Sequence, residues 1–147
     1  MNDFSLPQPA VNFLPHRPPL CLLDTLLACD DSGCRTEALV TATGIMVDGA
    51  GLLEPVALVE MIAQSFAAMR GYEDQRGGRP VREGFLVGVR RTALHGAVRV
   101  GDRLEITVRT SALIGAFAVA EGEVRRGAEV VASGSLKLWI PDPDQGK

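Results

Sequence analysis

Residues 55–72 of this chain read PVALVEMIAQSFAAMRGY, and this stretch decides the fold. From Val56 to Met69 almost every side chain is apolar or small, which is typical of a helix that is buried on nearly all sides. Pro55 suits the first position of such a helix, because its missing N–H would have no partner there. Gly71 supplies a stop signal at the other end. The sequence therefore predicts one long buried helix over 55–72.

Glu60 is the only charged residue inside the apolar run of this helix. Burying a carboxylate costs free energy unless another group pairs with it or uses it. One interpretation is a structural pair with Arg17 or with the backbone, and the other is an acid–base group in a site. Gln64 lies one turn further along the same face, where it either bonds the backbone of a neighbouring strand or contacts a substrate. We predict Glu60 as a catalytic residue and Gln64 as a substrate-binding residue.

Size and composition limit the class of protein. A length of 147 residues favours one domain, and a hydrophobic content of 46% is typical of a globular protein. The net charge of -3 gives no indication of nucleic acid or of an anionic membrane surface as a partner. No apolar segment reaches about 18 residues, so no membrane span is expected. The first residues lack the basic and apolar regions of a secretory signal, and we expect a soluble, cytoplasmic protein.

The cysteines and histidines do not predict a metal site or a disulfide framework. Cys21, Cys29 and Cys34 lack C-x-x-C spacing, and we expect buried, inert thiols. His95 precedes a glycine at the end of a predicted strand and is expected to be solvated. His16 stands between prolines and is a candidate for either a structural or a catalytic role.

The rest of the chain predicts an antiparallel sheet. Two segments, 20–30 and 35–43, flank a turn and predict a hairpin before the helix. A polar loop over 73–83 follows the helix. About four further strands are predicted, over 84–96, 104–109, 116–124 and 130–140. One helix packed against one curved antiparallel sheet is an α+β arrangement.

The two ends of the chain are predicted to lie outside this core. Residues 1–19 carry five prolines, which disfavour a regular strand or a long helix there. Residues 1–13 read as an N-terminal extension, with a short helical turn around 10–14. Residues 141–147 read as a frayed tail. The chain is therefore expected to be a single domain spanning 1–147.

Four short motifs stand in order along the chain. They are LPHRPPLCLLD (14–24), the E-x-x-A-Q pattern that begins at Glu60, GDRLEI (101–106) and G-x-L-x-L-W (134–139). Their order and spacing over 14–140 resemble the hotdog-fold 3-hydroxyacyl-(acyl-carrier-protein) dehydratases, and most closely the divergent dehydratases of aryl-polyene-type pathways. The resemblance implies a hotdog fold, with the long helix wrapped by the curved sheet. It also implies a dimer whose sheets join edge to edge, with acyl tunnels at the subunit boundary.

The resemblance implies a chemistry as well. The substrate would be a 3-hydroxyacyl thioester on the phosphopantetheine of an acyl carrier protein or of coenzyme A, with no other cofactor and no metal. In the family, a His in the loop before the helix removes the α-proton, and the helix carboxylate helps to expel the β-hydroxyl as water. At the matching position this chain has Met46, and the loop 45–53 contains no His. His16 and Asp48 are the candidates to compensate.

The loop before the helix also supplies candidate binding residues. Asp48, Gly49 and Gly51 are predicted to contact the substrate, because backbone near glycine can approach a ligand closely. N–H groups at the start of a helix favour an anion, as an oxyanion stabiliser must. The alternative is that both glycines serve turn geometry only.

The missing loop His leaves three functions open. The first is a dehydratase-like lyase in fatty-acid or polyene-type biosynthesis, with Glu60 as acid/base and His16 as its partner. The second is a hotdog thioesterase in which Glu60 activates water. The third is a non-catalytic acyl-thioester-binding subunit of a hetero-oligomer, so that both a homodimer and a heterodimer with another hotdog subunit are compatible with the sequence.

A cluster of arginines follows the apolar run of the helix. Arg70, Arg76, Arg79 and Arg82 form either a solvated loop or a contact for an anion. The anion would be the acidic surface of a carrier protein or the phosphate of phosphopantetheine, since guanidinium groups suit phosphate geometry.

Overall fold

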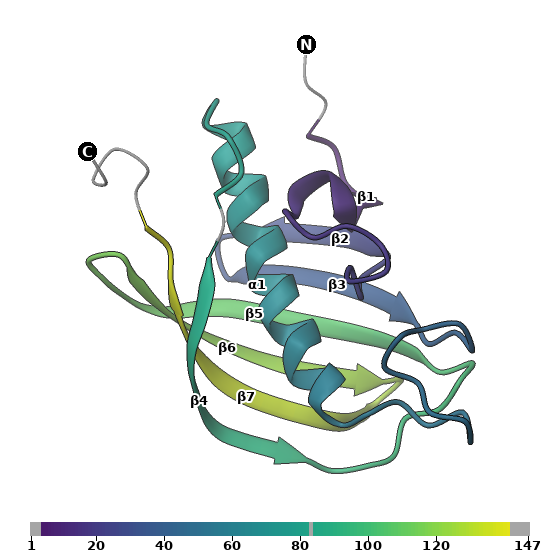
Figure 1. Cartoon of the computed structure of the whole chain (residues 1–147). Helices are drawn as coiled ribbons and strands as arrows, with labels where there is room; N and C mark the ends of the chain where they lie inside the picture. Colours follow the sequence, from purple (N-terminus) through teal and green to yellow (C-terminus); the bar gives the residue numbers. More distant parts are fainter. Residues whose placement is uncertain (1–3, 83, 142–147) are drawn as a thin grey trace.

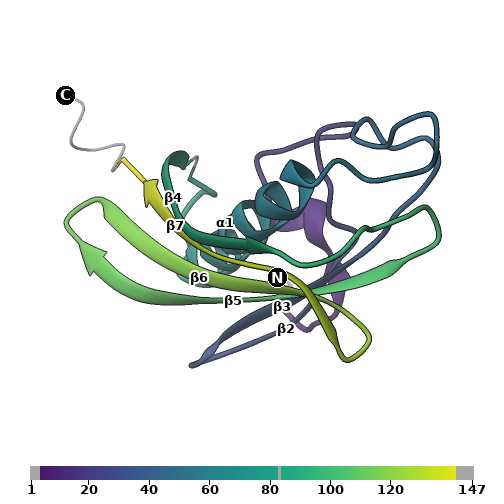
Figure 2. The same ribbon diagram turned by 90° about the horizontal axis from the view of Figure 1, so that it is seen from below.

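Within residues 4–82 and 84–141, which the computed structural model describes, seven strands form one antiparallel sheet that curves around a long helix (Figures 1 and 2). The strands are β1 (Gln8–Pro9), β2 (Thr25–Asp30), β3 (Gly33–Leu39), β4 (Phe85–Leu94), β5 (Arg103–Ile114), β6 (Phe117–Arg126) and β7 (Glu129–Trp139). The 3-10 helix η1 (Ala10–Phe13) and the long helix α1 (Val56–Arg76) complete the elements. The strand order β1-β2-β3-β5-β6-β7-β4 leaves β1 and β4 as the two edges. The predicted α+β arrangement is confirmed.

Alternation along the strands explains which face of the sheet meets the helix. On β5, Leu104, Ile106 and Val108 are buried, while the residues between them are more exposed. Their partners on β3 are buried too, as in the pair of Ile106 with Thr36. Directly paired residues of an antiparallel sheet point to the same face, so this face carries the core. The helix packs across it on β3, β5, β6 and β7.

The helix is longer than the predicted span 55–72, because Gly71 does not end it. The helix continues to Arg76, and Gly77 is its C-cap. The predicted loop over 73–83 is therefore wrong for its first four residues, and Glu83 lies outside the described residues. Gly71 instead allows a close approach of η1, since a Cβ atom there would lie 2.9 Å from the carbonyl carbon of Phe13.

Burial of the helix is incomplete. Most of its residues are buried, but one stripe is open, at the i, i+4, i+7 spacing of a single helix face. The stripe consists of Val56, Glu60, Ala67 and Arg70, with the small buried side chain of Ala63 on the same face between them, and we call these five residues the open stripe. The prediction of a helix buried on nearly all sides is thus wrong along this stripe, which no other part of the described chain covers completely.

No helix in the described part of the chain has both the length and the apolarity to cross a membrane.

The residues before β2 take part in the fold. β1 pairs with β2, and η1 packs against α1, where the ring of Phe13 meets that of Tyr72 at 5.4 Å between centroids. Residues 8–13, predicted as an extension, therefore add an edge strand and a helical turn to the core. Residues 1–3 and 142–147 lie outside the described residues, and the predicted frayed tail falls almost wholly among them.

The cysteines depart from the prediction of inert thiols. Cys29 of β2 and Cys34 of β3 form a disulfide, whereas Cys21 is free. The two bonded cysteines are direct cross-strand partners in the hairpin, a relation that linear spacing does not reveal without the register of the two strands. Cys29 is only partly buried and Cys34 fully buried.

Asp102 stabilises the turn that joins β4 to β5. Its Oδ2 accepts a hydrogen bond from the backbone N–H of Arg99 at 2.9 Å and another from Nη1 of Arg126 at 2.8 Å. These bonds, led by the one from Arg99, hold the pKa of Asp102 below its usual range. A group with a lowered pKa stabilises the fold above its unfolded-state pKa and loses that contribution as the pH falls.

We therefore expect Asp102→Asn to lower the free energy of unfolding by about 1 kcal/mol at pH 7, after allowance for solvent screening at this partly exposed site. The difference between wild type and variant should shrink as the pH falls below about 4. Urea unfolding at several pH values measures it. A difference that does not depend on pH would mean that the charge of Asp102 contributes nothing.

Candidate active site

The open stripe of α1 lines two adjoining pockets, and Glu60 belongs to both of them. The pocket near the start of the helix has a volume of about 330 Å³ and apolar walls, so we call it the apolar pocket. Its walls include Leu20, Leu22, Ile45, Met46 and Val56. The second pocket, of about 190 Å³, runs along the helix toward its end and carries two guanidinium groups, so we call it the arginine pocket. Its walls include Ala63, Ala67, Arg70, Arg82, Leu86 and Leu138.

His16 and Glu60 meet where the two pockets join. Nε2 of His16 lies 3.9 Å from Oε1 of Glu60, and the side chains are 32% and 39% exposed. Nδ1 of His16 is buried without a hydrogen-bond partner among the described residues. The structure thus brings together the two residues that the sequence singles out as catalytic candidates, and their role stays a prediction.

The loop that carries His16 is held by Arg17. Nη1 of Arg17 donates to the carbonyl oxygens of Leu14 at 2.7 Å and of His16 at 2.8 Å. Arg17 therefore closes its own loop, and the proposed structural pair between Arg17 and Glu60 is not found among the described residues. The loop leads the chain past Glu60, which places the imidazole beside the carboxylate.

Gln64 connects the helix to the segment before β2. Its Nε2 donates to the carbonyl oxygen of Leu20 at 2.9 Å, and its Oε1 accepts from the N–H of Leu22 at 2.8 Å. The same Nε2 donates to Oε1 of Glu60 at 3.0 Å. Gln64 is buried and serves the backbone of a neighbouring segment, while it also orients the carboxylate. Because Leu20 and Leu22 bond to the helix in this way, the strand predicted over 20–30 begins only at Thr25.

Asp48, Gly49 and Gly51 lie apart from the walls of both pockets. Oδ1 of Asp48 accepts from the N–H groups of Ala50 and Leu52, which closes the loop on itself. The N–H of Gly51 donates to the carbonyl oxygen of Asp48, and its positive φ of 80° suits glycine. In this conformation the three residues serve turn geometry, and their role in substrate binding stays a prediction.

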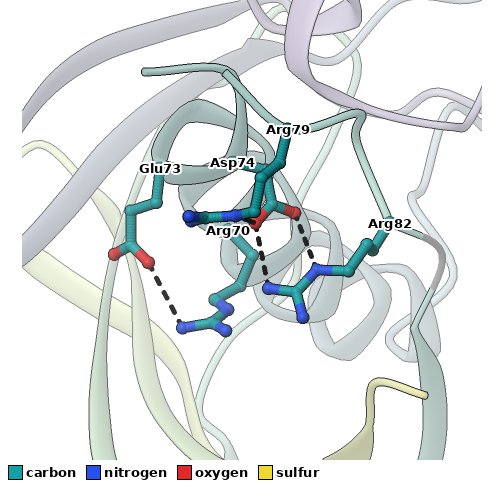
Figure 3. Close-up of polar contacts among 5 residues, drawn as sticks. All are labelled: Arg70, Glu73, Asp74, Arg79 and Arg82. Atoms are coloured by element: carbon teal, nitrogen blue, oxygen red, sulfur yellow. Dashed lines mark hydrogen bonds and ion pairs between the residues drawn. The ribbon is translucent and has the colours of Figure 1, made fainter. Parts of the chain in front are cut away.

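The arginines after the apolar run are organised by a buried carboxylate. Asp74 is almost fully buried, and Arg82 pairs with it through two hydrogen bonds of 2.9 and 3.1 Å (Figure 3). Arg79 approaches the same carboxylate at 3.4 Å, and Arg70 reaches Glu73 at 3.2 Å. The interpretation of a freely solvated arginine loop is therefore wrong for Arg82, whereas Arg79 contacts Asp74 and is 58% exposed.

Sequence reasoning named Arg70 and Arg82 as a possible anion contact but did not predict that they line a pocket together with Glu60. The signal for Arg70 was present, because 60, 63, 67 and 70 share one helix face at a period of 3.6. Arg82 could not be found in this way, since its position depends on the pairing with Asp74 across the end of the helix. Within the described residues, no three His, Cys, Asp or Glu side chains gather as a metal site requires.

The arrangement of the helix and the sheet identifies the fold class of the protein. A long helix across a curved antiparallel sheet is shared with the solved dehydratase heterocomplex ApeI:P from Xenorhabdus doucetiae, with a TM-score of 0.86, 23% identity and coverage of 93% of each chain. It is also shared with a hypothetical thioesterase from Streptococcus pneumoniae solved with coenzyme A, with a TM-score of 0.63 and 10% identity over 78% of this chain and 86% of that one. The protein has the hotdog fold of these dehydratases and thioesterases, as predicted.

The family follows from the sequence as a whole. Residues 8–147 match the ApeP-like family, described as ApeP dehydratase, and the chain belongs to this family. Among curated proteins, it is 25% identical over 138 residues to the 3-hydroxyacyl-[acyl-carrier-protein] dehydratase FabZ of Chlamydia trachomatis, over 88% of each chain. The predicted resemblance to hotdog dehydratases is confirmed.

Proposed function

We propose that the protein takes part in the dehydration of a 3-hydroxyacyl thioester, carried on an acyl carrier protein or on coenzyme A. The observation that supports this most is the pair of Glu60 and His16, 3.9 Å apart at the junction of two pockets. Two pockets that meet at the reacting groups suit a substrate with two arms, one on each side of the thioester. Membership of a dehydratase family points to the same reaction.

The reaction breaks the α-C–H bond and the β-C–O bond, forms a C=C bond and releases water. A base must accept the α-proton, and an acid must protonate the departing hydroxyl. His16 and Glu60 supply one imidazole and one carboxyl group for these two tasks. The separation of His16 and Glu60 suits groups that act on adjacent carbons. The proton that the base takes from Cα is passed to the acid, which gives it to the departing hydroxyl as water forms. Gln64 keeps the carboxylate of Glu60 turned toward the junction.

Two alternatives are supported by specific observations. A thioesterase would use Glu60 to activate water, and the partly exposed carboxylate beside a pocket allows this. A subunit without activity of its own would leave the base to a partner, in keeping with the absence of a His from the loop 45–53. The ApeI:P structure shows that a protein of similar fold forms a heterocomplex.

Intact-mass measurement on a panel of 3-hydroxyacyl carrier-protein thioesters tests the proposal. The expected result is a product lighter than the substrate by one water. Release of free carrier thiol would identify a thioesterase instead. If the purified chain changes no substrate, the same panel is repeated after co-expression with a second hotdog subunit, and activity gained only then would support the third function.

The proposed assembly is a dimer through the edge strand β4. Leu86 and Val89 pair with the buried residues Leu138 and Leu136 of β7, so they point to the helix side of the sheet. They are nevertheless 43% and 46% exposed, because the helix lies over the other strands. An apolar edge of this length invites pairing with a second chain. A second hotdog subunit there would cover β4 and enclose the arginine pocket, which Leu86 lines.

We expect Val89→Asp to abolish this association, because a carboxylate in a closed apolar interface has no partner. Sedimentation at micromolar concentration should show a dimer for the wild type, with itself or with a co-expressed subunit, and a monomer for the variant. Val100→Asp is the matched control, since Val100 is exposed in the turn before β5. Dimers that persist in Val89→Asp would exclude β4 as the interface.

A further inference from the structure

Arg70 has a buried donor that the protein itself does not use. Its Nε–H is buried and has no hydrogen-bond partner among the described residues. Within residues 4–82 and 84–141, the guanidinium is paired through Nη1 alone, with the exposed Glu73 at 3.2 Å. An unsatisfied buried donor costs free energy, and native proteins rarely keep one without a reason. An acceptor on a bound ligand would remove this cost.

The position of Arg70 shows where such an acceptor would be. Arg70 lies ten residues after Glu60 on the open stripe, which is about 15 Å along a helix. The stripe between them carries Ala63 and Ala67, whose small side chains leave space in the arginine pocket. A ligand with its thioester at Glu60 would therefore run over these alanines and end at Arg70.

The far end of the arginine pocket presents two guanidinium groups to a ligand. Arg70 and Arg82 both line it, and they pair with the carboxylates of Glu73 and Asp74 respectively. Asp74 is buried and holds Arg82 at the wall of the pocket. Arg70, by contrast, has no buried carboxylate partner, since Glu73 is exposed. Asp74 therefore holds the guanidinium of Arg82 in the wall of the pocket, whereas the guanidinium of Arg70 is able to bind a ligand.

We propose that Arg70 determines specificity in the reaction proposed above, by binding an anionic oxygen that the substrate carries about 15 Å from its thioester. This inference rests on the proposed function. Such an oxygen has two sources. One is the phosphate of phosphopantetheine, in which case the acyl chain occupies the apolar pocket. The other is a carboxylate at the far end of the acyl chain, in which case the pantetheine arm leaves through the apolar pocket.

Binding of unreactive analogues separates these sources without the need for turnover. Three amide-linked probes are titrated by calorimetry into the full chain, or into its complex where a partner is required. They are dodecanoyl-pantetheine, the same compound with a 4′-phosphate, and a pantetheine amide of dodecanedioic acid, whose extended chain spans about 15 Å as the helix rise from Glu60 to Arg70 requires. The wild type should bind one of the two anionic probes at least roughly 10-fold more tightly than the plain probe. A preference for the phosphate identifies the carrier arm, and a preference for the carboxylate identifies the acyl end.

Arg70→Met should remove that preference while it leaves the affinity for the plain probe within about 2-fold, because the stem still packs in the pocket. Arg76→Met is the matched control, since Arg76 lies on the same helix over the ring of Tyr72 and outside the pocket walls. Arg70→Lys, which keeps the charge without the Nε–H, should retain only part of the preference, and retained affinity for the plain probe shows that each variant folds. If the wild type favours neither anionic probe, or if Arg70→Met keeps the preference, the proposal is overturned. Water loss by the wild type is scored separately, so that a failure of the reaction is distinguishable from a failure of this site.

Discussion

Glu60→Gln is expected to lower the rate of water loss from a 3-hydroxyacyl thioester by roughly 10²- to 10⁴-fold, the usual contribution of general acid–base catalysis. The amide has the shape of the carboxylate and retains an oxygen that can accept the hydrogen bond from Gln64. It can neither accept nor donate a proton in the reaction. Substrate binding and folding should therefore survive while turnover is lost. Intact mass of the carrier-bound product, followed over time, measures the rate.

The matched control is Glu54→Gln, which removes a carboxylate from the exposed turn before α1, outside both pockets. It should retain the wild-type rate within about 3-fold, the range expected from a weakened helix-dipole interaction. If Glu60→Gln also retains its rate, the carboxylate is a structural partner of Gln64 and His16 only. If both variants lose activity together with their thermal stability, the loss reflects unfolding rather than chemistry.

His16 is the second residue whose substitution tests the proposed dehydration. His16→Ala should reduce the rate by a similar factor if the imidazole accepts the α-proton at its distance of 3.9 Å from Glu60. A rate that stays near the wild-type value would mean that one carboxyl group performs both proton transfers, or that a partner subunit supplies the base. These two cases are separated by whether the purified chain is active alone.

The helix positions of the site could be predicted from the sequence, because helical geometry is local. A carboxylate alone in an apolar run, with a glutamine one turn later, marked Glu60 and Gln64 at once. The same period would have marked Arg70 as a third member of the face. The approach of His16 could not be predicted, since it depends on how Arg17 closes the loop between Leu14 and the helix.

Short motifs proved informative about the family and less so about the site. In GDRLEI, Gly101 has a φ of 93° and donates its N–H to Val40, while Asp102 fastens the turn. This motif therefore marks a turn between two strands and no chemistry. The disulfide between Cys29 and Cys34 follows from the strand register. A single sequence gives that register only once the turn at Asp30 is known, because the turn fixes the pairing of the two strands.

Gly71 shows why a local signal can fail. Glycine favours helix ends because it tolerates left-handed conformations, yet Gly71 lies inside α1, six residues before the C-cap at Gly77. Its role is to let the backbone of η1 approach the helix. The evidence for this role is the carbonyl group of Phe13, which occupies the space that any side chain at this position would need.

Gly71→Ala is accordingly expected to destabilise the protein by about 3 kcal/mol, against the usual gain of about 1 kcal/mol when alanine replaces glycine in a helix. The added methyl group would overlap the carbonyl oxygen of Phe13, and backbone cannot turn aside as a flexible side chain can. The helix and η1 would have to separate, which would loosen the contact of Phe13 with Tyr72. Urea unfolding measures the change, with Gly49→Ala as the control, because a Cβ atom at Gly49 meets nothing within 4 Å. A variant as stable as the wild type would show that η1 can shift at no cost. The segment leading from η1 to His16 would then be adjustable, and the 3.9 Å separation from Glu60 could not be treated as a rigid feature of the site.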